Sequence, residues 1–249
     1  MEHQTMITFR DSLTFRSFPG NLDYEDVYFH EFAHEWWANK ITNKDWAHLW
    51  LQEGITTYAE ALALRELGGE AAYDLRMLKC RRKASLSENT KPLVPGNEAT
   101  MDEVYNGDIY DKGAMLMHTL RYVVGDSLFF PALKKFATDV KYPYNQFFTS
   151  DDVEKFFIRE SGKDLHPIFN FYLYTTKEIE INVFQKDSNS YFIAINNAPI
   201  ESLPLDISTD MGIIHTTMNA TKDKPFWIKS KTLPIIDPRG WYFRKVIYH

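Results

Sequence analysis

The sequence contains one cysteine, Cys80, among its 249 residues. A single thiol cannot form an internal disulfide, and it cannot supply the thiolates of a cysteine-based metal cluster. No apolar run approaches the roughly 20 residues that a membrane-spanning helix requires. A positive charge excess is also missing, because the formal net charge is −6. Nucleic-acid partners require a basic face, so these absences argue against a disulfide framework, a membrane span and a nucleic-acid partner.

The rest of the composition is typical of a soluble globular protein. Hydrophobic residues make up 44% of the chain and charged residues 25%, which is close to the average of globular domains. The length suits one large domain or two smaller ones. A disulfide-free chain is compatible with the cytoplasm as well as with the periplasm or the extracellular space.

The hydrophobic pattern changes near residue 176. Before this point apolar residues recur every three or four positions, as in helices, and after it they alternate, as in half-buried strands. The sequence therefore predicts an α+β protein. A mainly helical domain is expected over residues 1–176, followed by a small antiparallel β-sandwich over residues 177–249.

The individual elements follow from the same periodicities. Helices are expected over residues 24–39, 44–67, 70–87, 111–124, 127–140, 150–161 and 165–174. Strands are expected over residues 178–185, 191–195, 203–208, 213–218, 226–229 and 241–247. Prolines and glycines between residues 89 and 107 indicate a long loop. The basic residues Arg81–Lys83 of the third helix favour a solvated helix face.

The most informative motif is His30-Glu31-Phe32-Ala33-His34 in the first expected helix. Residues four apart lie one turn apart on the same helix face. Two imidazoles in this arrangement can bind one zinc ion, since zinc–nitrogen bonds measure about 2.0–2.1 Å. Glu31 follows the first histidine directly, which is the position of a general base acting on zinc-bound water.

A catalytic zinc site needs a third protein ligand and one open position. Glu53 meets this need, because it lies nineteen positions after His34 in the next expected helix. Glu60 lies one to two turns further along and is a candidate to hydrogen-bond a ligating histidine. The sequence therefore predicts one zinc ion bound by His30, His34 and Glu53.

These motifs resemble those of the gluzincin aminopeptidases, the family of aminopeptidase N and leukotriene hydrolase. The resemblance lies in the run from His30 to Trp37, in Lys44-Asp45-Trp46 and in Trp50-Leu51-Gln52-Glu53-Gly54, where Gln52 replaces the usual asparagine. It extends over roughly residues 1–175 and implies a thermolysin-like catalytic domain. It also implies that both histidines and Glu53 bind zinc while Glu31 activates water.

The resemblance assigns roles to three further residues. Tyr110-Asp111-Lys112-Gly113 is similar to the family's Y-x-K-G motif, whose tyrosine stabilises the oxyanion of the tetrahedral intermediate. Tyr105 is similar to a second active-site tyrosine. Met1-Glu2-His3 resembles the end of the family's G-x-M-E-N motif, with His3 in place of asparagine, which implies that Glu2 binds the free α-amino group of the substrate.

The resemblance implies a zinc aminopeptidase that acts on peptides with a free N-terminus. It also implies a large N-terminal β-domain and a first catalytic sheet ahead of Met1, so we expect the chain to be a fragment whose partner is this missing N-terminal domain. Three alternatives remain open at this stage. They are a zinc endopeptidase, an epoxide hydrolase of the same fold, and a catalytically silent scaffold that binds partners.

Overall fold

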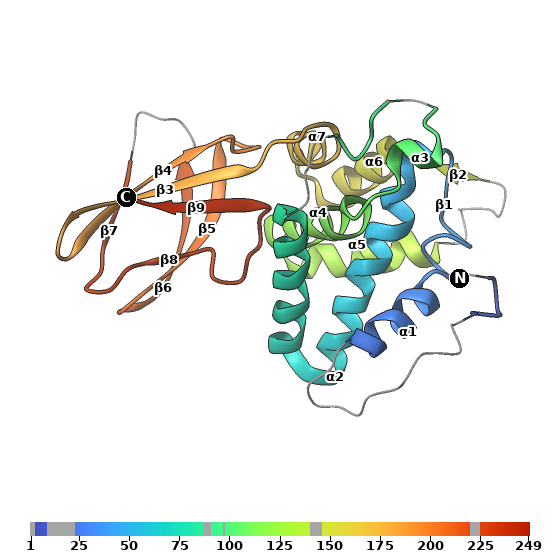
Figure 1. The fold of residues 1–249 in the computed structure, drawn as a ribbon, viewed down its shortest axis with the longest axis horizontal. Helices are drawn as coiled ribbons and strands as arrows, with labels where there is room; N and C mark the ends of the chain where they lie inside the picture. The colour runs from blue at the N-terminus through green and yellow to red at the C-terminus, as the bar shows by residue number, and fades with distance from the viewer. Residues whose placement is uncertain (1–2, 9–22, 87–90, 97, 140–145, 220–224) are drawn as a thin grey trace.

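A computed structural model describes residues 3–8, 23–86, 91–96, 98–139, 146–219 and 225–249 of the protein. The helices occupy the first part of the chain and most strands the last part (Figure 1). The helices are α1 (Asp23–Ala33), α2 (Leu49–Leu86), α3 (Met101–Val104), α4 (Asp108–Val124), α5 (Asp126–Thr138), α6 (Ser150–Ser161) and α7 (His166–Tyr174), and a 3-10 turn spans Trp46–His48. This arrangement confirms the predicted α+β class.

Helix α2 turns back on itself at Gly69, so its two halves run side by side (Figure 1). Gly69 has a φ of 73°, which lies in the left-handed region that glycine tolerates best. Side chains join the two halves across the turn, because the hydroxyl of Tyr73 donates to that of Tyr58 at 3.2 Å. The predicted break between the helices at residues 44–67 and 70–87 is therefore present, as a turn at Gly69.

Helix α2 crosses α4 at a contact between two glycines. A Cβ added to Gly54 would lie 2.7 Å from the Cα of Gly113 and 2.9 Å from the carbonyl oxygen of Ile109. These neighbours are backbone atoms, so they cannot rotate away. Because Gly54 follows Glu53 and Gly113 lies three residues after Tyr110, this crossing sets the separation between two predicted site residues.

We expect Gly54→Ala to destabilise the protein. The added methyl group overpacks the crossing, which typically costs about 1–3 kcal/mol, and urea denaturation would measure the loss. Gly107→Ala is the matched control, because the backbone of Gly107 is helical and a Cβ there meets nothing within 4 Å. Equal stability of the two variants would contradict the close crossing.

The strands form two sheets beside the helices. One sheet has the order β7-β4-β3-β9, built from β3 (Ile179–Asp187), β4 (Ser190–Asn196), β7 (Phe226–Lys229) and β9 (Arg244–Tyr248). The other has the order β6-β5-β8, built from β5 (Ser202–Thr209), β6 (Gly212–Asn219) and β8 (Ile235–Ile236). A separate parallel pair joins β1 (Thr42–Asn43) to β2 (Phe147–Phe148) among the helices.

The sandwich is not fully antiparallel, which corrects one detail of the prediction. Strand β9 pairs in parallel with β3, with Ile181 opposite Val246. A hairpin fixes the antiparallel direction of neighbouring strands, but β9 returns to β3 only after the chain has passed through the other sheet. Alternation along the sequence reports which face of a strand is buried and carries no information on direction.

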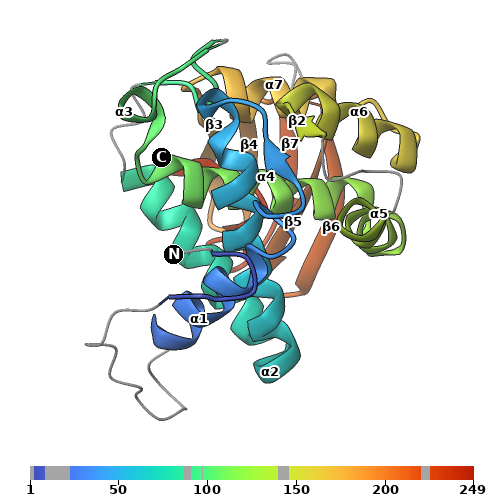
Figure 2. The same cartoon turned by 90° about the vertical axis from the view of Figure 1, so that its right-hand side faces the viewer.

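The helical and the strand parts meet in a packed boundary. The backbone N–H of Phe243 donates to the hydroxyl of Tyr172 at 2.9 Å, and the hydroxyl of Tyr122 donates to Asp206 at 2.8 Å. Figure 2, seen from the helical end, shows the strands behind the helices and α1 on the side away from the sheets. Among the described helices, none combines the length and the apolar character needed to cross a bilayer. The division into domains at residue 176 stays a prediction.

Candidate metal centre

The three predicted ligands come together between α1 and α2. Each ligand contributes one donor atom, and the three atoms, from His30, His34 and Glu53, lie within 4.8 Å of one another. The Oε2 atom of Glu53 lies 3.1 Å from Nε2 of His30 and 3.6 Å from Nε2 of His34. Ligands bound at about 2.0–2.2 Å around a tetrahedral zinc ion lie about 3.3–3.6 Å apart. The two distances from Glu53 are therefore close to the spacing that a zinc ion requires.

The ring of His34 is held so that its Nε2 atom faces Glu53. Its Nδ1 atom lies 3.0 Å from the carbonyl oxygen of Trp37, which can only accept a hydrogen bond. Nδ1 therefore carries the proton, and Nε2 keeps the lone pair that a metal needs. The carbonyl of Trp37 is available because α1 ends at Ala33 and the chain continues in turns. The prediction extended this helix to residue 39, and its earlier end is what supplies the acceptor.

The ring of His30 is held by a carboxylate from the first half of α2. Its Nδ1 atom lies 2.7 Å from Oε1 of Glu60, so Nδ1 donates to this carboxylate and Nε2 is the atom that faces Glu53. Oε2 of Glu60 accepts from Nε and Nη2 of Arg76 at 2.9 and 2.6 Å. Arg76 belongs to the second half of α2, so the turn at Gly69 is what brings it to Glu60. An orienting carboxylate of this kind commonly accompanies a ligating histidine.

The charge around His30 suits a cation. Burial opposes a charged imidazole, but the carboxylates of Glu53 and Glu60 outweigh this effect and raise the pKa of His30 to about 9. Groups that hold a proton on a buried imidazole also stabilise a divalent cation in its place. Two imidazoles and one carboxylate form a donor set that zinc accepts, and the residues present therefore fit a zinc ion.

We expect Glu60→Asp to lower zinc affinity about 10- to 100-fold, which is the usual effect of removing an outer hydrogen-bond partner of a ligand. Aspartate keeps the negative charge beside Arg76, but its side chain is one methylene too short to hydrogen-bond His30 and Arg76 at the same time. Competition with a chelator would measure the affinity. Glu66→Asp is the control, because Glu66 is exposed on the same helix. Unchanged affinity in Glu60→Asp would contradict the orienting role.

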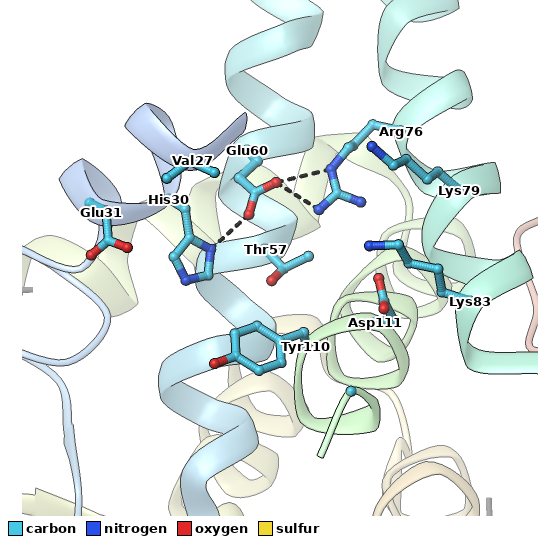
Figure 3. A pocket seen from close by; sticks show the side chains of 11 residues that line it. Val27, His30, Glu31, Thr57, Glu60, Arg76, Lys79, Lys83, Tyr110 and Asp111 are labelled. Atoms are coloured by element: carbon cyan, nitrogen blue, oxygen red, sulfur yellow. Dashed lines mark hydrogen bonds and ion pairs between the residues drawn. The ribbon is translucent and has the colours of Figure 1, made fainter. Parts of the chain in front are cut away.

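The predicted catalytic side chains line one cavity of about 530 Å³ together with His30 (Figure 3). Glu31 and Tyr110 both contribute to its wall. The ring centroid of Tyr110 lies 5.9 Å from that of His30, and its hydroxyl donates to the hydroxyl of Tyr105 at 3.1 Å. Tyr105 is therefore next to Tyr110, while Glu2 lies outside the described residues.

Sequence reasoning missed the basic residues of this cavity. Arg76, Lys79 and Lys83 line it from the second half of α2. Of the run Arg81–Lys83, which was expected to form a solvated face, Arg82 and Lys83 are exposed. The spacing of three and four between the residues that line the cavity places them on one helix face, and this was the available signal. The sequence could not show that the turn at Gly69 directs this face toward His30.

Comparisons with known proteins agree with these features. The model of the peptidase family M1 domain matches residues 1–172. Aminopeptidase N of Caulobacter vibrioides is 30% identical over 162 residues, which cover 61% of this chain and 18% of the relative. Aminopeptidase B of Mus musculus is 30% identical over 170 residues, which cover 61% of this chain and 25% of the relative. The matched region is therefore a quarter or less of each relative's length.

Solved structures share the fold. Aminopeptidase A of Legionella pneumophila, solved in complex with aspartic acid, aligns with a TM-score of 0.65 and 22% identity over 90% of this chain and 27% of its own. An M1 zinc metallopeptidase from Deinococcus radiodurans aligns with a TM-score of 0.54 and 24% identity over 62% of this chain and 34% of its own. Because the family match spans residues 1–172 and includes the histidines, Glu53 and Tyr110, the chain belongs to peptidase family M1.

Proposed function

We propose that this chain carries the catalytic site of a zinc-dependent aminopeptidase. The observation that carries the proposal is the arrangement of His30, His34 and Glu53, whose donor atoms lie within 4.8 Å of one another. Both histidines direct Nε2 toward the shared point because Glu60 and the Trp37 carbonyl hold Nδ1. The relatives named aminopeptidase N and aminopeptidase B support the same activity. We propose one zinc ion as the cofactor.

The side chains around the proposed zinc position have different roles in hydrolysis. A zinc ion held there would supply Lewis-acid chemistry, polarising a carbonyl group and lowering the pKa of water to about 7. The carboxylate of Glu31 accepts a proton from the attacking water and later delivers it to the leaving amine. The phenol of Tyr110 donates a hydrogen bond to the carbonyl oxygen as negative charge develops on it. While the single phenol proton of Tyr110 points at the carbonyl oxygen, the hydroxyl of Tyr105, 3.1 Å away, donates to the Tyr110 oxygen and so helps to orient it.

We propose in addition that the enzyme is specific for substrates with a free N-terminus. The carboxylate of Glu2 pairs with the α-ammonium group of the substrate, a charge that an internal peptide bond does not offer. Its motif resembles the amine-binding segment of the family. We also propose that residues 1–176 form the catalytic domain and that residues 177–249 form a separate β-domain.

Zinc content and hydrolysis test the proposal together. Protein purified without chelator is expected to contain close to one zinc per chain, and a leucyl-anilide with a free amine is expected to be hydrolysed. The N-acetylated anilide is the control for the role of the amine. Equal cleavage of both anilides would indicate an endopeptidase instead of an aminopeptidase. Absence of zinc from the protein would overturn the enzymatic function itself.

A further inference from the structure

Helix α2 carries a buried hydroxyl group beside the second proposed ligand. The side chain of Thr56 is fully buried. Its Oγ1 atom lies 3.2 Å from Nδ1 of His34 and 3.3 Å from the carbonyl oxygen of Trp37. A hydroxyl removed from water costs free energy unless it has hydrogen-bond partners. Thr56 therefore has one partner on the ring of His34 and one on the backbone that holds this ring.

The direction of each hydrogen bond follows from the available donors. Nδ1 of His34 carries the proton, because it also faces the carbonyl oxygen of Trp37 at 3.0 Å. The hydroxyl of Thr56 accepts from this N–H, and its own proton is donated to the carbonyl oxygen of Trp37. This oxygen has two lone pairs, so it can accept from His34 and from Thr56 together. The three groups form a closed triangle of hydrogen bonds.

The position of Thr56 on α2 connects this triangle to the rest of the metal centre. Glu53, Thr56 and Glu60 are three and four residues apart, so they lie on one face of the helix. Glu53 offers the third donor atom, Glu60 holds the ring of His30, and Thr56 contacts the ring of His34. One helix face therefore reaches both histidines and also supplies the carboxylate that lies between them.

We infer that Thr56 is a positioning residue of the zinc site, whose hydroxyl fixes the rotation of the His34 ring. The inference rests on the proposed zinc-dependent function and adds an outer hydrogen-bond partner to the second ligand. The carbonyl of Trp37 by itself defines one hydrogen bond, about which the ring can still turn. The hydroxyl adds a second contact to the same N–H and also holds the carbonyl in place, so that Nε2 of His34 stays directed toward Glu53.

Replacing Thr56 by valine tests this role, because valine keeps the β-branched shape and removes the hydroxyl. We expect zinc affinity, measured by competition with a chelator, to fall about tenfold, the lower end of the range for loss of an outer hydrogen-bond partner. The lower end applies because the carbonyl of Trp37 still accepts from His34. Thr56→Ser keeps the hydroxyl and is expected to retain most of the native affinity.

Cobalt(II) in place of zinc gives a second measurement that does not depend on hydrolysis. Its d–d absorption bands report the geometry of the ligands around the ion. We expect these bands to change in position or intensity in Thr56→Val and to keep the native spectrum in Thr56→Ser.

Thr119→Val is the matched control. Thr119 is also fully buried, and its hydroxyl donates to the carbonyl oxygen of Trp241 at 2.6 Å and lies 2.6 Å from the hydroxyl of Tyr172. This variant therefore removes a comparable hydroxyl at the boundary between the helices and the strands. Its thermal stability is expected to fall, while its zinc affinity and cobalt spectrum are expected to stay native.

Three results would overturn the inference. They are native zinc affinity in Thr56→Val, an equal loss in Thr56→Ser, which would assign the effect to packing, and an equal loss in Thr119→Val, which would assign it to reduced stability. If Thr56→Val does not fold, Thr56→Ala takes its place in the comparison with Thr56→Ser, because alanine introduces no new volume.

Failure of the proposed function gives a different pattern. If zinc affinity depends on Thr56 as expected but the native protein does not hydrolyse the leucyl-anilide, the aminopeptidase function is contradicted and the positioning role is supported. If the native protein hydrolyses the anilide and Thr56→Val binds zinc as tightly as the native protein, only the positioning role is contradicted. Absence of zinc binding from the native protein contradicts both.

Discussion

Replacing Glu31 by glutamine is expected to lower kcat about 10²- to 10⁴-fold, the range that general acid–base catalysis contributes. Glutamine has nearly the same shape as glutamate but cannot accept a proton from water or return one to the leaving amine. Glu31 lines the cavity and is not one of the three converging donors, so zinc content is expected to stay at the native level. Steady-state hydrolysis of the leucyl-anilide and metal analysis by mass spectrometry measure both quantities.

The combination of results identifies the role of Glu31. A loss of activity with zinc retained supports the proton-transfer role. If zinc is lost together with activity, Glu31 contributes to metal binding and the proposed assignment is wrong. Activity within threefold of the native value would show that another group accepts the proton.

The second large effect concerns the third ligand. Loss of an outer hydrogen-bond partner of a ligand lowers metal affinity by up to roughly 100-fold. Because Glu53 is itself a proposed ligand, Glu53→Gln is expected to lower zinc affinity by more than this, and to lower activity in proportion. The change removes the negative charge that faces both Nε2 atoms, at 3.1 Å from His30 and 3.6 Å from His34. Chelator competition gives the affinity, and added zinc is expected to restore part of the activity.

Glu66→Gln provides the matched comparison for this variant. Glu66 is exposed and lies on the first half of α2, as Glu53 does, but it does not line the cavity. The control should bind zinc as the native protein does. Equal zinc affinity in Glu53→Gln and Glu66→Gln would remove Glu53 from the ligand set and leave the two histidines without a protein carboxylate.

Local spacing predicted the elements that depend on near neighbours. The four-residue separation of His30 and His34 indicated a common face, and the alternation after residue 178 indicated strands. The family resemblance found from these motifs is confirmed by the match over residues 1–172. The possible contact of Glu60 with a histidine is present as a 2.7 Å hydrogen bond to His30. The roles of the individual site residues stay predictions.

Features that depend on distant parts of the chain could not be predicted in this way. The end of α1 at Ala33 follows from hydrogen bonds in the turns around Trp37, and no helix-breaking residue marks it. Arg76 and Lys83 reach the cavity only because α2 reverses at Gly69. The parallel pairing of β9 with β3 depends on the path of the chain through a second sheet.

The contact between Gly54 and Gly113 has a consequence for how firmly the site is organised. Glu53 and Tyr110 are tied to each other through two helix backbones that touch directly, with no side chain between them. A side chain at such a crossing could change rotamer and let the helices shift, whereas two backbones in contact have no comparable freedom. The distance between the metal ligand and the phenol is therefore fixed before any substrate arrives, and binding need not spend free energy on setting it.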